Sequence, residues 1–160
     1  MRRCPGIRSA KVGYGILPAF IFGVNDGSRK GTLMSYMMNW EAKGVYVRFA
    51  DHVDARQVDS ATCDMYNHEH FDEMQYFIWD ATRIKSLDMN QDDTQIMAFT
   101  DRVASSYKHF LKGAFVVEDS AVREVVRQYI ELSLAIGNPW EHRLFNDEQQ
   151  ARTWVASAQR

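Results

Sequence analysis

The chain has 160 residues, of which 46% are hydrophobic, 12% are aromatic and 25% are charged, and these values are typical of one soluble globular domain with a bulky core. The net charge of −2 is unevenly spread, because residues 1–33 hold six lysine and arginine residues against one aspartate, which leaves −7 for residues 34–160. An acidic body excludes nucleic acid as a partner, since phosphate binding needs a basic face.

The cysteine content and the hydropathy pattern indicate a cytoplasmic protein. Two cysteines, Cys4 and Cys63, are too few for a disulfide framework, and we expect Cys63 to be a reduced, packed thiol. No apolar run reaches the ~18 residues that a membrane span requires. Contact with a membrane surface stays open on this pattern.

Residues 1–33 are predicted to lie outside the functional domain, which we place at 34–160. Their basic start and apolar patch resemble a secretory signal, but glycine and proline interrupt the patch and no small-residue cleavage site follows. The codons of Lys30-Gly31 form a purine run shortly before Met34. A bacterial ribosome-binding site lies at a similar distance before its start codon. We therefore expect a disordered leader or a mis-assigned start.

Strand patterns recur along the rest of the chain. Apolar alternation predicts two strands, at 34–41 and 44–50, joined by a hairpin that ends in Gly44. A continuous apolar run over 74–81 is typical of a strand buried on both faces. Two further strand patterns cover 112–118 and 141–146.

The first two predicted helices lie between these strands. Asp54 followed by Gln57 has the spacing of a capping box, and it precedes helical periodicity over 54–70. A second helix is predicted over 93–110. Its apolar residues recur at helical spacing, and we expect this stripe to face the core. The stripe consists of Ile96, Thr100, Val103 and Tyr107.

Two more helices complete the pattern. The third, over 119–137, begins at Asp119 or Ser120 and ends at Gly137. The fourth, over 146–158, is predicted to begin at Asn146. The order β-β-α-β-α-β-α-β-α predicts a single α/β domain with a mixed, mostly parallel sheet of about five strands and about four helices.

Two stretches within this pattern resemble the STAS fold, and more closely its SpoIIAA-like family. The first is FIWDATRIKSLDMNQ, and the second is PWEHRLFNDEQQARTWV. The resemblance covers residues 34–158 and implies a non-catalytic regulatory or binding module. The residues that carry it are Asp80, Ile84, Leu87, Asp88, Phe145, Asp147, Ala151 and Trp154.

The chain departs from the STAS pattern at its phosphorylation site. The phosphorylated serine of that pattern falls on Met89, and the next serine falls on Asn90. Ser86 lies on the strand side of this position and Thr94 lies a full turn inside the helix, so neither should replace the serine. The resemblance therefore implies a module without a phosphorylation site.

The segment that follows the third strand is the predicted site. Its acidic residues supply a cap and negative charge at a helix N-terminus, and on one reading they do only that. On the other reading the same segment binds a protein partner, because α/β sheets bind at the carboxyl ends of parallel strands. The predicted partner or ligand-binding residues are Asp88, Met89, Asn90, Gln91, Asp92, Asp93, Met97 and Phe99.

Two alternative functions remain open. The resemblance implies that the module is a carrier or sensor of a small apolar, lipid-like ligand, and Met97 and Phe99 would then stand beside an internal cavity. The second alternative is an enzyme whose residues are scattered along the sequence.

Sequence motifs for catalysis, metals and cofactors are weak. His68 and His70 in NHEH have no third ligand cluster nearby, so they predict a solvated helix end and no metal site. The chain has no strained G-x-S-x-G elbow and no glycine-rich phosphate loop in its body. We therefore predict no catalytic residues, no metal and no cofactor.

Overall fold

The structure is a computed structural model that describes residues 35–157 of the chain. The expectations for residues 1–33, the start at Met34 and the end of the last helix at Ala158 fall outside this range.

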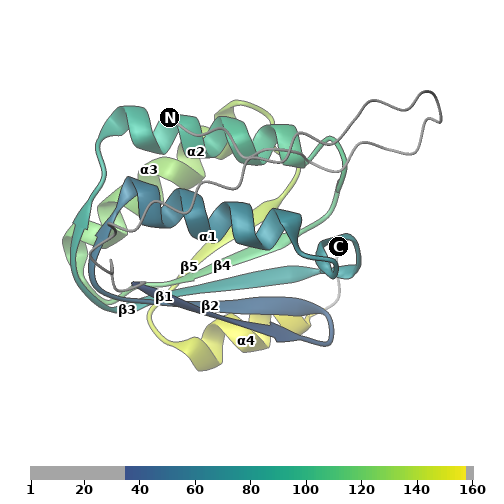
Figure 1. Cartoon of the computed structure of the whole chain (residues 1–160), viewed down its shortest axis with the longest axis horizontal. Coiled ribbons are helices and arrows are strands. Elements are labelled where there is room, and N and C mark those ends of the chain that lie inside the picture. The colour runs from purple at the N-terminus through teal and green to yellow at the C-terminus, as the bar shows by residue number, and fades with distance from the viewer. Residues whose placement is uncertain (1–34, 158–160) are drawn as a thin grey trace, which may run out of the picture.

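A five-stranded mixed sheet forms the centre of the domain (Figure 1), in the order β1-β2-β3-β4-β5. The first pair is an antiparallel hairpin and every other pair is parallel, which confirms the predicted sheet. The strands are β1 (Tyr36–Glu41), β2 (Gly44–Asp54), β3 (Tyr76–Asp88), β4 (Lys112–Val116) and β5 (Glu141–Phe145).

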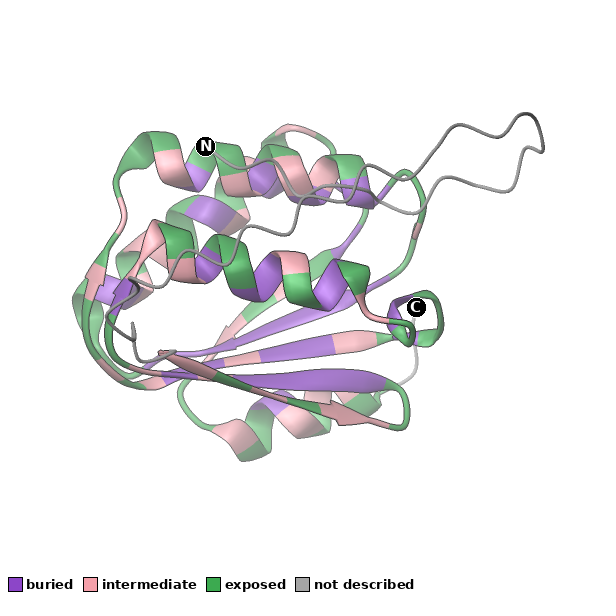
Figure 2. Cartoon of the chain, in the orientation of Figure 1, coloured by how far each residue is buried: buried purple, intermediate pink, exposed green. Residues whose placement is uncertain are grey.

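Helices cover both faces of the sheet, as Figure 1 shows: α1, α2 and α3 lie on one face and α4 on the other. The helices are α1 (Ala55–Asn67), α2 (Gln91–Ala104), α3 (Ser120–Ala135) and α4 (Glu148–Ala156), with a short 3-10 turn over Phe71–Glu73. The larger core lies under the three helices, and a smaller one lies under α4 (Figure 2). The predicted α/β domain is confirmed.

Local side-chain bonds explain where two helices begin. Asp54 accepts a bond from the backbone of Gln57 at 3.0 Å, and the Gln57 side chain accepts from the backbone of Asp54 at 2.9 Å, so the predicted capping box exists. The predicted N-cap of α4 is wrong by one residue. Asp147, not Asn146, is its N-cap, because the Asp147 carboxylate accepts from the Gln150 backbone at 2.8 Å.

β3 is longer than the apolar run predicted. It continues through residues 82–88, which pair with the end of β2 after β4 has ended opposite Asp80. The two strands therefore form a ribbon that extends past the rest of the sheet. β2 carries two register shifts in this ribbon, and Asp51 between them has φ 62°, a conformation that bends the strand.

The orientation of α2 differs from the prediction. Ile96 and Val103 of the expected inward stripe are exposed, and the helix ends at Ala104, so Tyr107 lies beyond it. The inward face instead carries Thr94, Ala98, Asp101 and Ala104. Small side chains let α2 lie close to its neighbours, and periodicity of large apolar residues could not reveal that.

Cys63 also differs from its prediction. The described residues include no free cysteine, so the expectation of a reduced thiol is wrong.

Candidate functional site

The segment after β3 is a helix start with an exposed acidic surface. Asn90 caps α2: the backbone of Asp93 donates to Asn90 Oδ1 at 3.0 Å, and the backbone of Asn90 donates to Asp93 Oδ2 at 3.0 Å. This reciprocal pair places negative charge at the positive end of the helix dipole. Asp88 and Asp92 are exposed and form no ion pair with a described residue, so their charge faces outward.

The outward side of α2 is apolar. Ile96 is 43% exposed, and Phe99 and Val103 are each 55% exposed, on one side of the helix. Tyr107 and Phe110, which follow the helix in the chain, are also exposed, at 63% and 69%. We call these five residues the outer face of α2. Monomeric proteins rarely expose a contiguous apolar surface without a binding role.

An apolar cavity lies on the opposite side of α2, between the sheet and the helices. It is a partly open cavity of about 50 Å³ near the carboxyl ends of the strands. Aliphatic and aromatic side chains from all three covering helices and from β2, β3 and β4 form its wall. They include Met89 and Met97 of the predicted site, together with Trp79, Leu87, Val126 and Tyr129.

A second void of about 10 Å³ adjoins the cavity on the side of Asp101. The two voids share Trp79, Met97, Phe115 and Tyr129 as walls. Of these four side chains, Met97 is the unbranched, flexible one, so a change of its rotamer is the easiest way to join the voids.

Trp79, one of the residues that line the cavity, has an unpaired polar group buried away from the cavity surface. Its Nε1–H is buried and has no hydrogen-bond partner among residues 35–157. The ring packs against Phe49, Phe77 and Phe115 at centroid distances of 5.2, 5.8 and 6.0 Å, and rings of this kind offer no strong acceptor. Most buried donors in folded proteins are paired, so this one requires an explanation.

Asp101 lies at the centre of a buried polar cluster. Its two carboxylate oxygens accept hydrogen bonds from Tyr66 of α1 and Tyr129 of α3, which ties three helices together. Burial raises the pKa of Asp101 to about 6, although both tyrosine bonds act to lower it. The same burial and the nearby Asp101 charge raise the pKa values of both tyrosines well above their usual value.

His142 of β5 extends this cluster. Its Nε2 lies 3.3 Å from the Tyr129 hydroxyl, and its Nδ1 lies 3.4 Å from the Ser133 hydroxyl. Since Tyr129 donates to Asp101, a neutral ring with its proton on Nε2 satisfies every one of these contacts. Burial lowers the pKa of His142 to about 4, which fits that neutral form.

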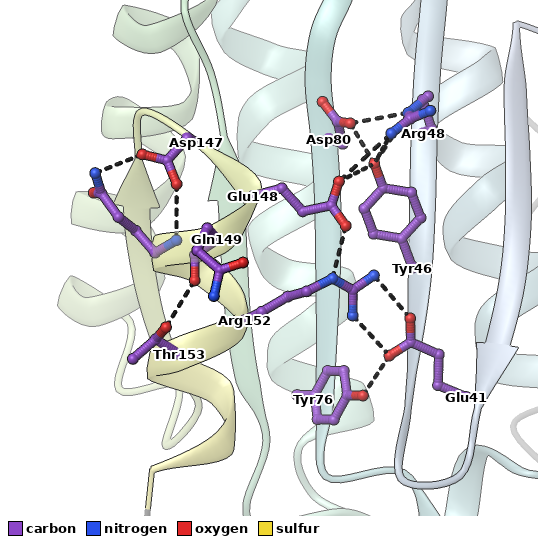
Figure 3. Close-up of polar contacts among 11 residues, drawn as sticks. Glu41, Tyr46, Arg48, Tyr76, Asp80, Asp147, Glu148, Gln149, Arg152 and Thr153 are labelled. Atoms are coloured by element: carbon purple, nitrogen blue, oxygen red, sulfur yellow. Dashed lines mark hydrogen bonds and ion pairs between the residues drawn. The ribbon is translucent and has the colours of Figure 1, made fainter.

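A second polar network lies on the other face of the sheet, beneath α4 (Figure 3). Arg48 bonds Asp80 at 3.0 Å and lies 3.6 Å from Glu148, while Arg152 bonds Glu148 at 2.6 Å and Glu41 at 3.0 Å. Both guanidinium groups are thus engaged by carboxylates. This network fastens α4 to the hairpin.

Asp80 of the STAS-like stretch belongs to that network. Burial raises the pKa of its carboxyl group, but bonds from Thr82, Tyr46 and Arg48 outweigh this and hold the pKa below its usual value. Thr82 donates to it through its backbone at 2.9 Å and through its hydroxyl at 2.6 Å. Asp80 therefore has a structural role at the point where β4 ends.

The structure divides the predicted site residues between two sides of α2. Met89 and Met97 line the cavity, whereas Phe99 points outward, so its predicted place beside the cavity is wrong. The exposed residues of the segment lie at the N-terminal end of the outer face, and they are Asp88, Asn90, Gln91 and Asp92. Sequence reasoning missed Trp79, Asp101 and His142, because a tryptophan in a buried strand and an aspartate within a helix give no functional signal by themselves.

The other singled-out polar residues have local roles. Ser86 lies in the exposed ribbon, where its hydroxyl is 2.7 Å from His52 Nδ1. His68 stacks on Trp40 with a centroid distance of 3.9 Å. Within residues 35–157, no group of three or more histidine, cysteine or acidic residues is placed to hold a metal ion. In the same range, no helix is long and apolar enough to cross a bilayer.

No family model and no curated protein matches this sequence. Among solved structures, the chain is similar to an uncharacterised protein of the DUF3478 family from Shewanella loihica PV-4, whose structure has a SpoIIAA-like fold. The similarity covers 81% of this chain and 100% of the other, with 13% sequence identity and a TM-score of 0.51. At this identity the similarity concerns the fold, and it agrees with the element order and the sheet topology. The chain is therefore a single α/β domain with a SpoIIAA-like fold.

Proposed function

We propose that the protein is a non-catalytic regulatory module that binds a protein partner through the outer face of α2. The observation that carries this proposal is the exposure of Ile96, Phe99 and Val103 on one side of a single helix. Their spacing of three and four residues is the spacing of the anchors by which a helix docks into an apolar groove. The module acts without a phosphorylation switch, because Met89 packs against the core at the position of the STAS serine.

The charge of the same region indicates the chemistry of the partner. Asp88 and Asp92 lie at the N-terminal end of the outer face and form no ion pair within residues 35–157. A matching surface therefore has an apolar groove with lysine or arginine at one end. The apolar contacts would supply most of the affinity, and the charges would set the orientation and the rate of association.

Replacing Phe99 with glutamate should weaken partner binding by at least about 30-fold, because a buried aromatic anchor contributes about 2 kcal/mol or more to an interface. The matched control is Leu134→Glu on α3, which adds the same charge at an apolar residue that is 77% exposed outside the outer face. Quantitative affinity capture from native lysate, with binding constants then measured for the captured protein, compares both variants with the wild type. Retention of the same partner by Phe99→Glu at unchanged affinity would contradict the proposal.

The charge contribution is measured separately with Asp88→Lys. This variant should slow association and reduce its dependence on salt, while dissociation changes little. Equal association rates for the wild type and Asp88→Lys at low salt would remove the acidic segment from the interface.

The cavity supports a second candidate function, the binding of a small apolar ligand. Its wall is apolar, and two of its residues, Met89 and Met97, are adaptable methionines. Its volume of about 50 Å³ is smaller than the ~150 Å³ of a cavity that holds benzene, so a ligand of that size would need Met97 to move or α2 to separate from α3. Native mass spectrometry after mild purification tests this function. Copurification of a small molecule is the expected result, and its reproducible absence would count against an endogenous ligand in the cavity.

A further inference from the structure

A larger, partly open cavity of about 120 Å³ lies at the amino end of the parallel strands, between two turns. The β1–β2 hairpin, from Trp40 to Gly44, forms one side, and His70, Glu73 and Met74 of the 3-10 turn and its flanks form the other. We call it the amino-end cavity. The hairpin turn lies at the opposite end of the sheet from the start of α2 (Figure 1), so this cavity is separate from the apolar cavity and from the predicted site.

Contacts within the protein fix the walls of the amino-end cavity. The backbone N–H of Gln75 donates to the carbonyl oxygen of Lys43 at 2.7 Å, which joins the two turns. The ring of Trp40 is stacked on His68 with a centroid distance of 3.9 Å, and the backbone N–H of His70 donates to His68 Nδ1 at 3.2 Å. The cavity is therefore formed before anything binds, as ligand sites usually are.

The wall combines apolar surface with two opposite charges. Lys43 on the hairpin and Glu73 on the 3-10 turn line the cavity and are exposed, and neither forms an ion pair within residues 35–157. The carboxylate of Glu41 is not available in the same way, because it is bound to Arg152 at 3.0 Å and accepts a hydrogen bond from Tyr76. One cation and one anion thus remain to meet a ligand, from opposite sides of the cavity.

This wall limits the chemistry of the ligand. A molecule with a single charge would find its partner on one turn and a like charge on the other, whereas a zwitterion satisfies both. Trp40 and the buried Met74 offer apolar surface for the rest of the molecule. The volume is below the ~150 Å³ of a cavity that holds benzene, so the apolar part has only a few carbon atoms.

We propose that the amino-end cavity binds a small zwitterion of the class of free amino acids with short aliphatic side chains. Glu73 binds the ammonium group, Lys43 binds the carboxylate, and Trp40 and Met74 contact the aliphatic side chain. This site is independent of partner binding through the outer face of α2, so either proposal can fail without the other.

The test uses the isotope-labelled full chain, with assigned resonances, and three probes that share one body. L-Valine carries both charges, isobutylamine is valine without its carboxylate, and isovalerate is valine without its ammonium group. L-Valine should shift the indole N–H resonance of Trp40, and each of the other two should bind about two- to five-fold more weakly, as the loss of one exposed ion pair predicts. The indole of Trp154, which packs on the other face of the sheet, is the internal control and should not move.

Two variants on the exposed turns assign the charges. In Lys43→Ala, L-valine should bind no more tightly than isobutylamine, and in Glu73→Ala no more tightly than isovalerate. Lys85→Ala removes the same charge from the ribbon, outside the cavity, and should keep the wild-type preference.

Each contrary outcome removes a defined part of the inference. If none of the three probes shifts the Trp40 indole, the amino-end cavity is not a site for such molecules. Equal affinities of the three probes for the wild type would overturn the selectivity for a zwitterion. A preference for L-valine that survives in both Lys43→Ala and Glu73→Ala would overturn the roles of these two residues.

Discussion

Replacing Asp101 with alanine should lower the free energy of unfolding by about 3–5 kcal/mol, which places it among the most destabilising substitutions in this chain. The carboxylate accepts bonds from Tyr66 and Tyr129, and its removal leaves two buried hydroxyl groups without acceptors. Each such group costs about 1–3 kcal/mol. The variant also loses the contact through which α1, α2 and α3 are held together.

Urea unfolding followed by circular dichroism measures this effect, and two variants control for its cause. Asp101→Asn keeps an acceptor oxygen for one tyrosine and should lose clearly less stability than Asp101→Ala. Tyr66→Phe removes one donor while the carboxylate keeps its bond to Tyr129, so it should cost about 1 kcal/mol. If Asp101→Ala unfolds within 1 kcal/mol of the wild type, the cluster does not hold the helices together.

Asp101 also explains why sequence periodicity placed the wrong side of α2 inward. A prediction from hydrophobic periodicity assigns large apolar residues to the core. It therefore placed Ile96 and Val103 on the side of α2 that faces the sheet. In the structure, the inward side is defined by Ala98 and Asp101, and the aspartate is tolerated there because two tyrosines from other helices satisfy it. Such a partnership links residues 28 and 35 positions apart, and a local pattern carries no information on it.

The elements themselves could be predicted because their signals are local. The hairpin at Gly44, the capping box at Asp54 and the end of α3 near Gly137 each depend on a few adjacent residues. Each appears in the structure where the sequence placed it, and Gly137 has the positive φ that favours glycine after a helix. The ribbon at the end of β3 was missed for the opposite reason. Within residues 82–88 the apolar side chains are Ile84 and Leu87, which lie three positions apart and so lack the alternation typical of a strand. These residues form a strand because the end of β2 pairs with them.

The sequence predicts where a binding site would lie, but it does not predict how the residues of that segment are arranged. The carboxyl end of a parallel sheet is a general binding location, and the chain after β3 was therefore a sound place to expect contacts. Which residues face the cavity and which face outward depends on the rotation of α2. That rotation placed Met97 and Phe99, two residues apart, on opposite sides of the helix.

Acidification should change stability in opposite directions in Asp101→Asn and His142→Gln. In the folded protein, the pKa of His142 is lowered from 6.5 to about 4, so its contribution is present above pH 6.5 and is lost as the pH falls through 4. The pKa of Asp101 is raised from 3.8 to about 6, so its contribution is present below pH 3.8 and is lost as the pH rises through 6. In the wild type the two contributions oppose each other between pH 4 and pH 6.

Each variant removes one contribution and exposes the other. Relative to the wild type, Asp101→Asn should lose about 2–3 kcal/mol between pH 6.5 and pH 4, because only the cost of charging His142 remains. His142→Gln should gain a similar amount over the same interval, because only the protonation of Asp101 remains. Urea unfolding at half-unit pH steps measures the free energy for all three proteins. Parallel profiles for the two variants would show that Asp101 and His142 do not titrate in the folded protein over this range, and that the hydrogen bonds through Tyr129 hold both groups in one protonation state.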